Sequence, residues 1–298
     1  MCSSDLSRRL STFSLALAFL SLSLPAHHVF GRFSLPVESA LKPSLPLLTA
    51  QNNLGLAYGD GSLGTPDYAR SRHWFERAAE GGFAVALKNL GVLYATGSGL
   101  PRNPAKAFEL YRQAAEMGQA EAQNNLGAIY YAGELVPRDL DLAVKWIRRA
   151  AEQDFTVAQK NLGLMLARGD GVARDPVQSV HWLRRAADAG NAEAQRCLAQ
   201  AYLSGLGVAS DGTSAAHWFN LAAGQGDAEA ANFLGLMLAE GSGVPRDRVT
   251  AHYWFSVAAH VGHPDAGRHL AALETAMTAE ELVSARRAAE TVTKSRRN

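Results

Sequence analysis

Apolar residues recur along this chain with a constant period of 36 residues. Each copy of the pattern has a leucine that follows an alanine by four positions. The leucines are Leu54, Leu90, Leu126, Leu162, Leu198, Leu234 and Leu270. A constant period of this size is typical of stacked supersecondary units rather than of a closed globule. The pattern therefore predicts a repeat array, although 298 residues would be enough to bury a single large core.

Within one repeat the spacing predicts two helices. In the third repeat, apolar residues fall at helical spacing over residues 122–130 and again over 143–150. Gly133 and Pro137 lie between these segments, where they favour a loop and prevent a continuous helix. Each repeat is therefore expected to be a hairpin of two helices, each about a dozen residues long.

The expected helix ends recur with the same phase. Before each second helix stands a short oxygen-bearing side chain that can cap free N–H groups, namely Asp67, Asn103, Asp139, Asp175, Asp211 and Asp247. After each second helix we expect a residue in the left-handed conformation, usually glycine. These residues are Gly82, Gly118, Gly190, Gly226 and Gly262, with Asp154 as the exception in repeat three.

Two sets of recurrent residues are interpreted as packing residues. The first helices contain glycines that would let the second helix approach closely, namely Gly55, Gly91, Gly127, Gly163 and Gly235. The second helices contain tryptophans at one phase, namely Trp74, Trp146, Trp182, Trp218 and Trp254. An aromatic ladder for carbohydrate or peptide is the alternative for the tryptophans. A residue found in nearly every unit is better explained by the contact that every unit makes with its neighbour.

The shared pattern is Ala-x-x-x-Leu-Gly-x-x-Tyr, a Gly-x-Gly-Val loop, an Asp, then Ala-x-x-Trp and Ala-Ala before a closing Gly. Repeat six shows most of it, in Ala230, Leu234, Gly235, Gly241, Gly243, Val244, Asp247, Ala251, Trp254, Ala258, Ala259 and Gly262. This pattern resembles the Sel-1-like repeat family, which is related to the tetratricopeptide repeats. The resemblance implies an all-α fold, a right-handed α-solenoid of stacked helix-turn-helix hairpins, and a role in protein interaction.

The chain divides into four segments by composition. Residues 1–26 hold Arg8 and Arg9, an apolar run from 10 to 24 and then Pro25-Ala26, which predicts a signal peptide cleaved after Ala26. An uncleaved anchor and an organelle transit peptide are the alternatives. Residues 27–46 are expected to form an extended, proline-containing linker. The array is predicted over 47–273, as six hairpins plus a seventh first helix, and residues 274–298 as a C-terminal capping helix with a basic tail.

Charge and cysteine content narrow the functional class. The formal net charge is +1, so the chain lacks the concentrated basic surface that nucleic acid requires. The apolar run of the leader is shorter than the ~20 residues that cross a bilayer, so no membrane span is expected in the mature chain. After cleavage Cys197 is the one remaining thiol, so no disulfide can form within the chain. The fold is therefore expected to be stabilised by packing alone. We expect a monomeric periplasmic or secreted protein.

Functional residues are expected where the repeats differ. By the arrangement of the related tetratricopeptide repeats, first helices line the concave side, and the position two before each recurrent leucine should face it. The residues there, called the ladder below, are Asn52, Lys88, Asn124, Lys160, Arg196, Asn232 and Arg268. Such amides and cations could clamp the carboxylates or backbone of a peptide. The alternative is a solvated face neutralised by pairs three residues apart, Glu193 with Arg196 and Asp265 with Arg268.

A second polar set lies one position after the ladder, in Asn53, Asn89, Asn125 and Asn161. These amides are expected to form hydrogen bonds within the array. His252, His260, His263 and His269 gather near the C-terminus, but no compact Cys/His motif accompanies them, so neither a metal nor another cofactor is predicted.

Catalysis is disfavoured by the motifs. Some secreted members of the resembled family are described as penicillin-binding or β-lactamase-like, and Ser39 and Lys42 have the Ser-x-x-Lys spacing. They lie in the predicted linker, and no Ser-Asp-Asn or Lys-Thr-Gly follows. The sequence therefore predicts a non-catalytic scaffold or adaptor of the cell envelope, or a periplasmic regulator of a signalling partner. A cell-wall-active or β-lactamase-like hydrolase is the alternative.

Overall fold

The computed structural model describes residues 43–295, of which 44 onward belong to one compact unit. Within these residues the chain forms helices and no strands. The first helices of the repeats are α1 (Leu45–Gly59), α3 (Ala84–Thr96), α5 (Ala120–Ala132), α7 (Thr156–Arg168), α9 (Ala192–Ser204), α11 (Ala228–Glu240) and α13 (Ala266–Ala276). The second helices are α2 (Tyr68–Glu80), α4 (Pro104–Glu116), α6 (Leu140–Ala151), α8 (Pro176–Asp188), α10 (Gly212–Gly224) and α12 (Arg248–His260), and α14 (Ala279–Ser295) ends the described chain.

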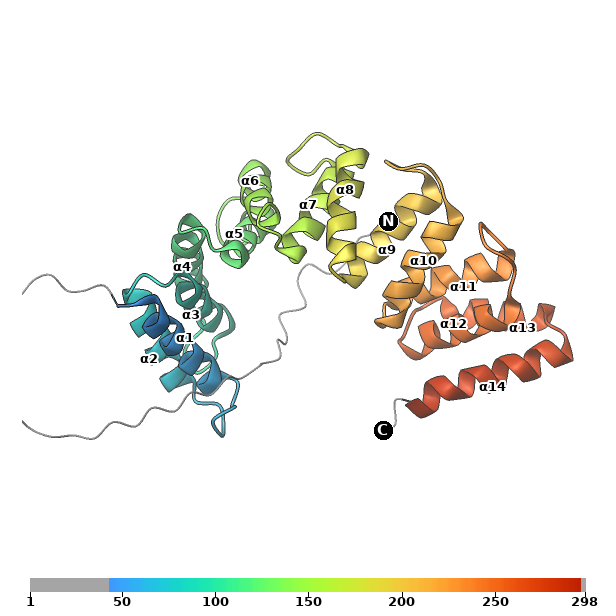
Figure 1. The fold of residues 1–298 in the computed structure, drawn as a ribbon, viewed down its shortest axis with the longest axis horizontal. Helices are drawn as coiled ribbons and strands as arrows, with labels where there is room; N and C mark the ends of the chain where they lie inside the picture. Colours follow the sequence, from blue (N-terminus) through green and yellow to red (C-terminus); the bar gives the residue numbers. More distant parts are fainter. Residues whose placement is uncertain (1–42, 296–298) are drawn as a thin grey trace, which may run out of the picture. The chain divides into compact units, whose positions relative to one another are not determined.

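The helices of the repeats pack mainly against their neighbours in the sequence. Each of the first six first helices packs against the second helix of its own repeat, and each second helix packs against the next first helix (Figure 1). The predicted all-α solenoid of stacked hairpins is confirmed. Because the packing runs from one hairpin to the next, the buried apolar residues are distributed along the array rather than gathered in one central core.

The local signals at the helix ends are confirmed. Each of the six predicted capping residues accepts a hydrogen bond from a backbone N–H two or three residues further on. The five predicted glycines have φ between 86° and 93°. Asp154 takes the same left-handed conformation with φ of 61°, and it is the one non-glycine residue with positive φ in the described part of the chain.

Close packing explains the recurrent glycines. A Cβ atom on Gly127 would lie 2.6 Å from Cγ1 of Ile147 and 3.0 Å from the carbonyl oxygen of Ala143. A Cβ atom on Gly163 would lie 2.8 Å from Cγ of Leu183. First helix and second helix therefore approach more closely than any larger residue would allow.

Trp146 and Trp182 belong to apolar clusters that span neighbouring hairpins, as predicted, but the tryptophans are less deeply buried than expected. Trp182 is buried and the other four are half-buried. The residue that follows the tryptophan is the fully buried one, as in Phe219 and Phe255. That residue faces the first helix of its own repeat, whereas Trp146 packs against an apolar cluster that includes residues of the preceding repeats.

The two ends of the array differ. At the N-terminal end α1 begins at Leu45, inside the predicted linker, because Pro46 lies in the first turn, where its missing N–H costs nothing. At the C-terminal end α14 packs against α12. The backbone N–H of Thr278 donates to Glu281 and the N–H of Glu281 donates to Thr278 Oγ1, which confirms the predicted capping box at the start of α14. The helices described include none that is both long and apolar enough to cross a membrane.

Candidate functional site

The ladder residues connect consecutive first helices. Asn89 Nδ2 of α3 donates to Asn52 Oδ1 of α1 at 2.9 Å, and Asn161 Nδ2 of α7 donates to Asn124 Oδ1 of α5 at 2.9 Å. Asn232 Oδ1 of α11 lies 2.8 Å from Nδ1 of His269 in α13. The second polar set thus forms hydrogen bonds within the array at two of its members, as predicted. Its first member, in α1, is exposed.

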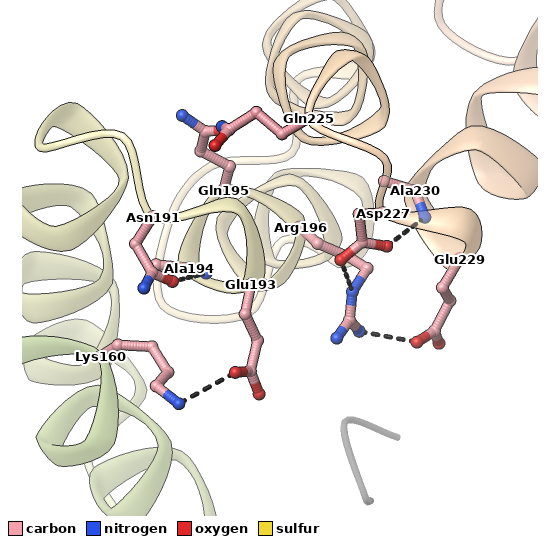
Figure 2. Close-up of polar contacts among 10 residues, drawn as sticks. All are labelled: Lys160, Asn191, Glu193, Ala194, Gln195, Arg196, Gln225, Asp227, Glu229 and Ala230. Carbon is pink, nitrogen blue, oxygen red and sulfur yellow. Dashed lines mark hydrogen bonds and ion pairs between the residues drawn. The ribbon is translucent and has the colours of Figure 1, made fainter. Parts of the chain in front are cut away.

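The cations of the ladder form ion pairs with the next repeat. Lys88 Nζ lies 2.9 Å from Glu121 Oε2, and Lys160 Nζ lies 2.9 Å from Glu193 Oε2. Figure 2 shows Lys160 of α7 reaching the first turn of α9. In every case the lysine is on one first helix and the glutamate is at the start of the following one.

Arg196 forms ion pairs with two carboxylates at the N-terminal end of α11. Its Nε lies 2.9 Å from Asp227 Oδ2 and its Nη1 lies 2.8 Å from Glu229 Oε2 (Figure 2). Asp227 is also the N-cap of α11, because its other oxygen accepts from the N–H of Ala230 at 2.8 Å. The guanidinium is therefore held against the N-terminus of α11 by the two carboxylates.

The carboxylates are more open to solvent than the cations they neutralise. The side chains of Lys88, Lys160 and Arg196 are 10–13% exposed. The glutamates paired with them are 37–42% exposed. The cations are thus nearly covered, and the groups offered to solvent are the carboxylates. A molecule approaching this face meets negative charge first.

The alternative interpretation of the ladder as locally paired charges is correct only at its end. Asp265 pairs with Arg268 within α13 at 2.9 Å, and Arg268 is exposed. The expected pairing of Glu193 with Arg196 is replaced by pairs with the repeats before and after. All ladder residues except Arg268 are therefore brought into contacts between repeats.

A row of glutamines also joins the repeats, and the sequence interpretation missed it. Gln123, Gln159 and Gln195 are buried, and each Nε2 donates to a backbone carbonyl in the last turn of the preceding second helix, at 3.1, 3.3 and 3.1 Å. These bonds satisfy carbonyls that a helix end leaves free. Their spacing of 36 residues was the available signal.

The candidate chemistry of the other motifs finds little support. His252 is buried and its Nε2 lies 2.9 Å from Glu274 Oε1, a contact that joins α12 to α13. In the part of the chain that the structure describes, no group of three or more His, Cys, Asp or Glu residues could hold a metal ion. Cys197 is buried. Ser39, Lys42 and the predicted signal peptide lie outside the described residues.

A family model for the Sel1 repeat matches six consecutive segments, residues 48–83, 84–119, 120–155, 156–191, 192–227 and 228–263. The chain belongs to the Sel1 repeat family. Sel1 repeat proteins generally mediate protein–protein interactions, and the family is typically non-catalytic.

Two solved Sel1-type structures are similar over most of the chain. A protective antigen of uropathogenic Escherichia coli with an SLR fold is 33% identical, with a TM-score of 0.75 over 82% of this chain and 52% of that one. This Sel1 chain thus spans about half the length of the antigen. A Sel1 repeat protein from Oxalobacter formigenes is 31% identical, with a TM-score of 0.64 over 72% of this chain and 87% of that one. No curated protein matched.

Proposed function

We propose that this Sel1 repeat protein is a non-catalytic scaffold of the cell envelope that binds a protein partner on the face formed by its first helices. The family supports the class of function. Glu121, Glu193 and Glu229 are half-exposed and share one position of the repeat, and they support the choice of face. The residue at this position differs between repeats, whereas the core residues are constant. Val157 occupies the same phase in α7 and is exposed.

The charge distribution of this face favours a partner with cationic or N–H donor groups. The sequence alone suggested that the ladder, with its cations Lys88, Lys160 and Arg196, could clamp the carboxylates of a peptide. In the folded array these cations are already neutralised and nearly covered, so an anionic segment would have to displace the array's own carboxylates. A cationic segment meets half-exposed carboxylates directly and needs no such exchange.

One experiment distinguishes a cationic from an anionic partner, because the two predict opposite changes in binding affinity. Once a partner has been captured with the purified chain, its affinity is titrated against the double variant Glu121→Gln and Glu193→Gln. For a cationic segment the variant should bind more weakly by ~1.5–3 kcal/mol, the range for hydrogen bonds to charged groups. For an anionic segment it should bind more tightly, because the two lysines are released.

The matched control is Glu152→Gln with Glu240→Gln, which changes the net charge equally at exposed positions away from the ladder. The control should leave the affinity unchanged. If both double variants lower the affinity equally, the effect is one of net charge and the proposed face is wrong. Rising salt should weaken binding to the unaltered protein, since partly exposed charges are screened.

The envelope location rests on the composition of residues 1–26. Cell fractionation, followed by N-terminal sequencing of the recovered protein, tests it. We expect the protein in the periplasmic or secreted fraction with His27 as its first residue. An intact N-terminus in the cytosolic fraction would refute the location without affecting the proposed binding face.

A further inference from the structure

The first helix of the first repeat has an open side. Three residues of α1 occupy positions that face the preceding repeat elsewhere in the array, namely Ala50, Asn53 and Leu54, and all three are exposed. The corresponding residues of α3 are Ala86, Asn89 and Leu90, and all three are buried. The described chain thus ends, at α1, with half of a repeat–repeat interface.

The composition of α1 differs from that of the other first helices. No residue of α1 is charged, whereas every other first helix carries at least one charged side chain. Its exposed large side chains include Leu47 and Leu54. Exposed apolar side chains grouped without charges mark interaction surfaces.

We propose that the open side of α1 binds the same side of α1 in a second copy of the chain, which forms a two-fold symmetric dimer. The surface continues the interface that the array already uses between its repeats. The opposite end of the array is closed, because α14 packs against α12 and buries Ala285. A head-to-tail contact therefore lacks its second surface, and pairing of like ends closes at two copies.

The side chains suit pairing with themselves. Leucine and alanine pack without a directional requirement. The amide of Asn53 both donates and accepts, so two such amides can pair across a two-fold axis, as Asn89 and Asn52 pair between repeats. No like charges are brought together by this arrangement, since α1 has none.

The small size of the surface predicts a weak dimer. A helix of 15 residues is ~22 Å long and ~10 Å wide. Its side covers less than the roughly 800 Å² per partner of a standard specific interface. We therefore expect a reversible, concentration-dependent equilibrium. The sequence alone predicted a monomer, and the open side of α1 is the observation that changes this expectation.

Sedimentation velocity of the full chain over a range of concentrations tests the proposal. Leu54→Glu and Asn53→Asp would each place two like charges at the axis, and each should raise the dimer dissociation constant at least about tenfold. The matched control is Val283→Glu on α14, where the side chain is 70% exposed at the closed end, and it should leave the equilibrium unchanged.

Circular dichroism melting of each variant shows whether it is folded, and Asn53→Asp, which conserves shape, serves if Leu54→Glu unfolds. A monomer at every concentration overturns the proposal, whatever else covers α1. A dimer that survives both α1 variants, or that the Val283→Glu control disrupts equally, also overturns it.

Discussion

Leu54 and Leu126 occupy the same position of the repeat, yet Leu54 is 36% exposed and Leu126 is fully buried. Each follows an alanine by four positions and precedes a glycine. The difference is the neighbour, because α5 packs against both α4 of the preceding hairpin and α6 of its own, whereas α1 packs against α2 and has no preceding hairpin among the described residues. Burial in this array is therefore a property of position in the stack as much as of the residue.

The two ends extend the comparison. At the C-terminal end α14 covers α12, and the buried His252 of α12 pairs with the half-exposed Glu274 of α13. At the N-terminal end α1 has no such cover among the described residues. Terminal repeats of a solenoid need a polar outer face or a partner to remain soluble. At the C-terminal end α14 provides the outer face, and at the N-terminal end we infer a partner.

The largest expected effect comes from the matched leucines. Leu126→Ala should destabilise the protein by about 2–5 kcal/mol, through lost burial and the cavity left behind. Leu54→Ala should cost less than about 1 kcal/mol, because that side chain is already partly in water. Chemical denaturation measures both. Equal losses would mean that α1 is covered as completely as α5, and hydrogen exchange should show the Leu126→Ala damage concentrated in the middle of the array.

A smaller effect on stability is expected from two glycine-to-alanine substitutions, one at a close contact and one in open space. Gly127→Ala should destabilise by about 1–3 kcal/mol, since its new methyl group would overlap Ile147 and the fixed carbonyl of Ala143. Gly267→Ala in α13 should be neutral or stabilising by up to about 1 kcal/mol, because no atom lies within 4 Å of the added Cβ and alanine favours the helix. Melting temperatures compare the two, and a stable Gly127→Ala protein would contradict the close helix packing.

The C-terminal cap should loosen in acid. The hydrogen bond from His252, with the nearby charge of Arg286, holds the pKa of Glu274 below its ordinary value of 4.5. A carboxyl group with a lowered folded-state pKa contributes stability that is complete above the ordinary value and is lost as the pH falls through the folded value. Protection of α14 against hydrogen exchange should therefore drop below pH 4.5.

Glu274→Gln supplies the control for that titration. The variant should protect α14 less at neutral pH and should lose the acid-dependent step. If the unaltered protein and the variant lose protection in parallel as the pH falls, another group controls the docking of α14.

The smallest effect is expected at the buried thiol. Cys197 occupies the phase that asparagine holds in α1, α3, α5 and α7, so Cys197→Asn should change the free energy of unfolding by less than about 1 kcal/mol. Melting in the presence and absence of a reductant measures it. A large loss that appears only under oxidising conditions would reveal an intermolecular disulfide.

The elements of the fold were predictable because their signals are local. Asp139 caps α6, and Asp154 ends its hairpin within a few residues of the helix. The ends of the helix can therefore be predicted from residues that are adjacent in the sequence. The small residue Gly127 and its large partner Ile147 belong to one hairpin. Such contacts repeat with the period and need no knowledge of how the hairpins stack.

The site was only partly predictable because its contacts cross between repeats. Glu193 could pair with Arg196 three residues away, and the stacking instead places it beside Lys160, which is 33 residues away. The period identifies equivalent positions but not which variable side chains meet across a junction. For the same reason the sequence predicted a capping helix after α13 without indicating that it would pack on α12.

Site-specific photo-crosslinking tests the proposed binding face most directly. Val157 and Val177 are both exposed valines, one on first helix α7 and the other on the adjacent second helix α8. A photo-reactive amino acid is introduced at either position in the full chain, in the presence of the captured partner. The account predicts a crosslink from position 157 and none from 177. A crosslink from 177 alone would place the partner on the second helices and contradict the account.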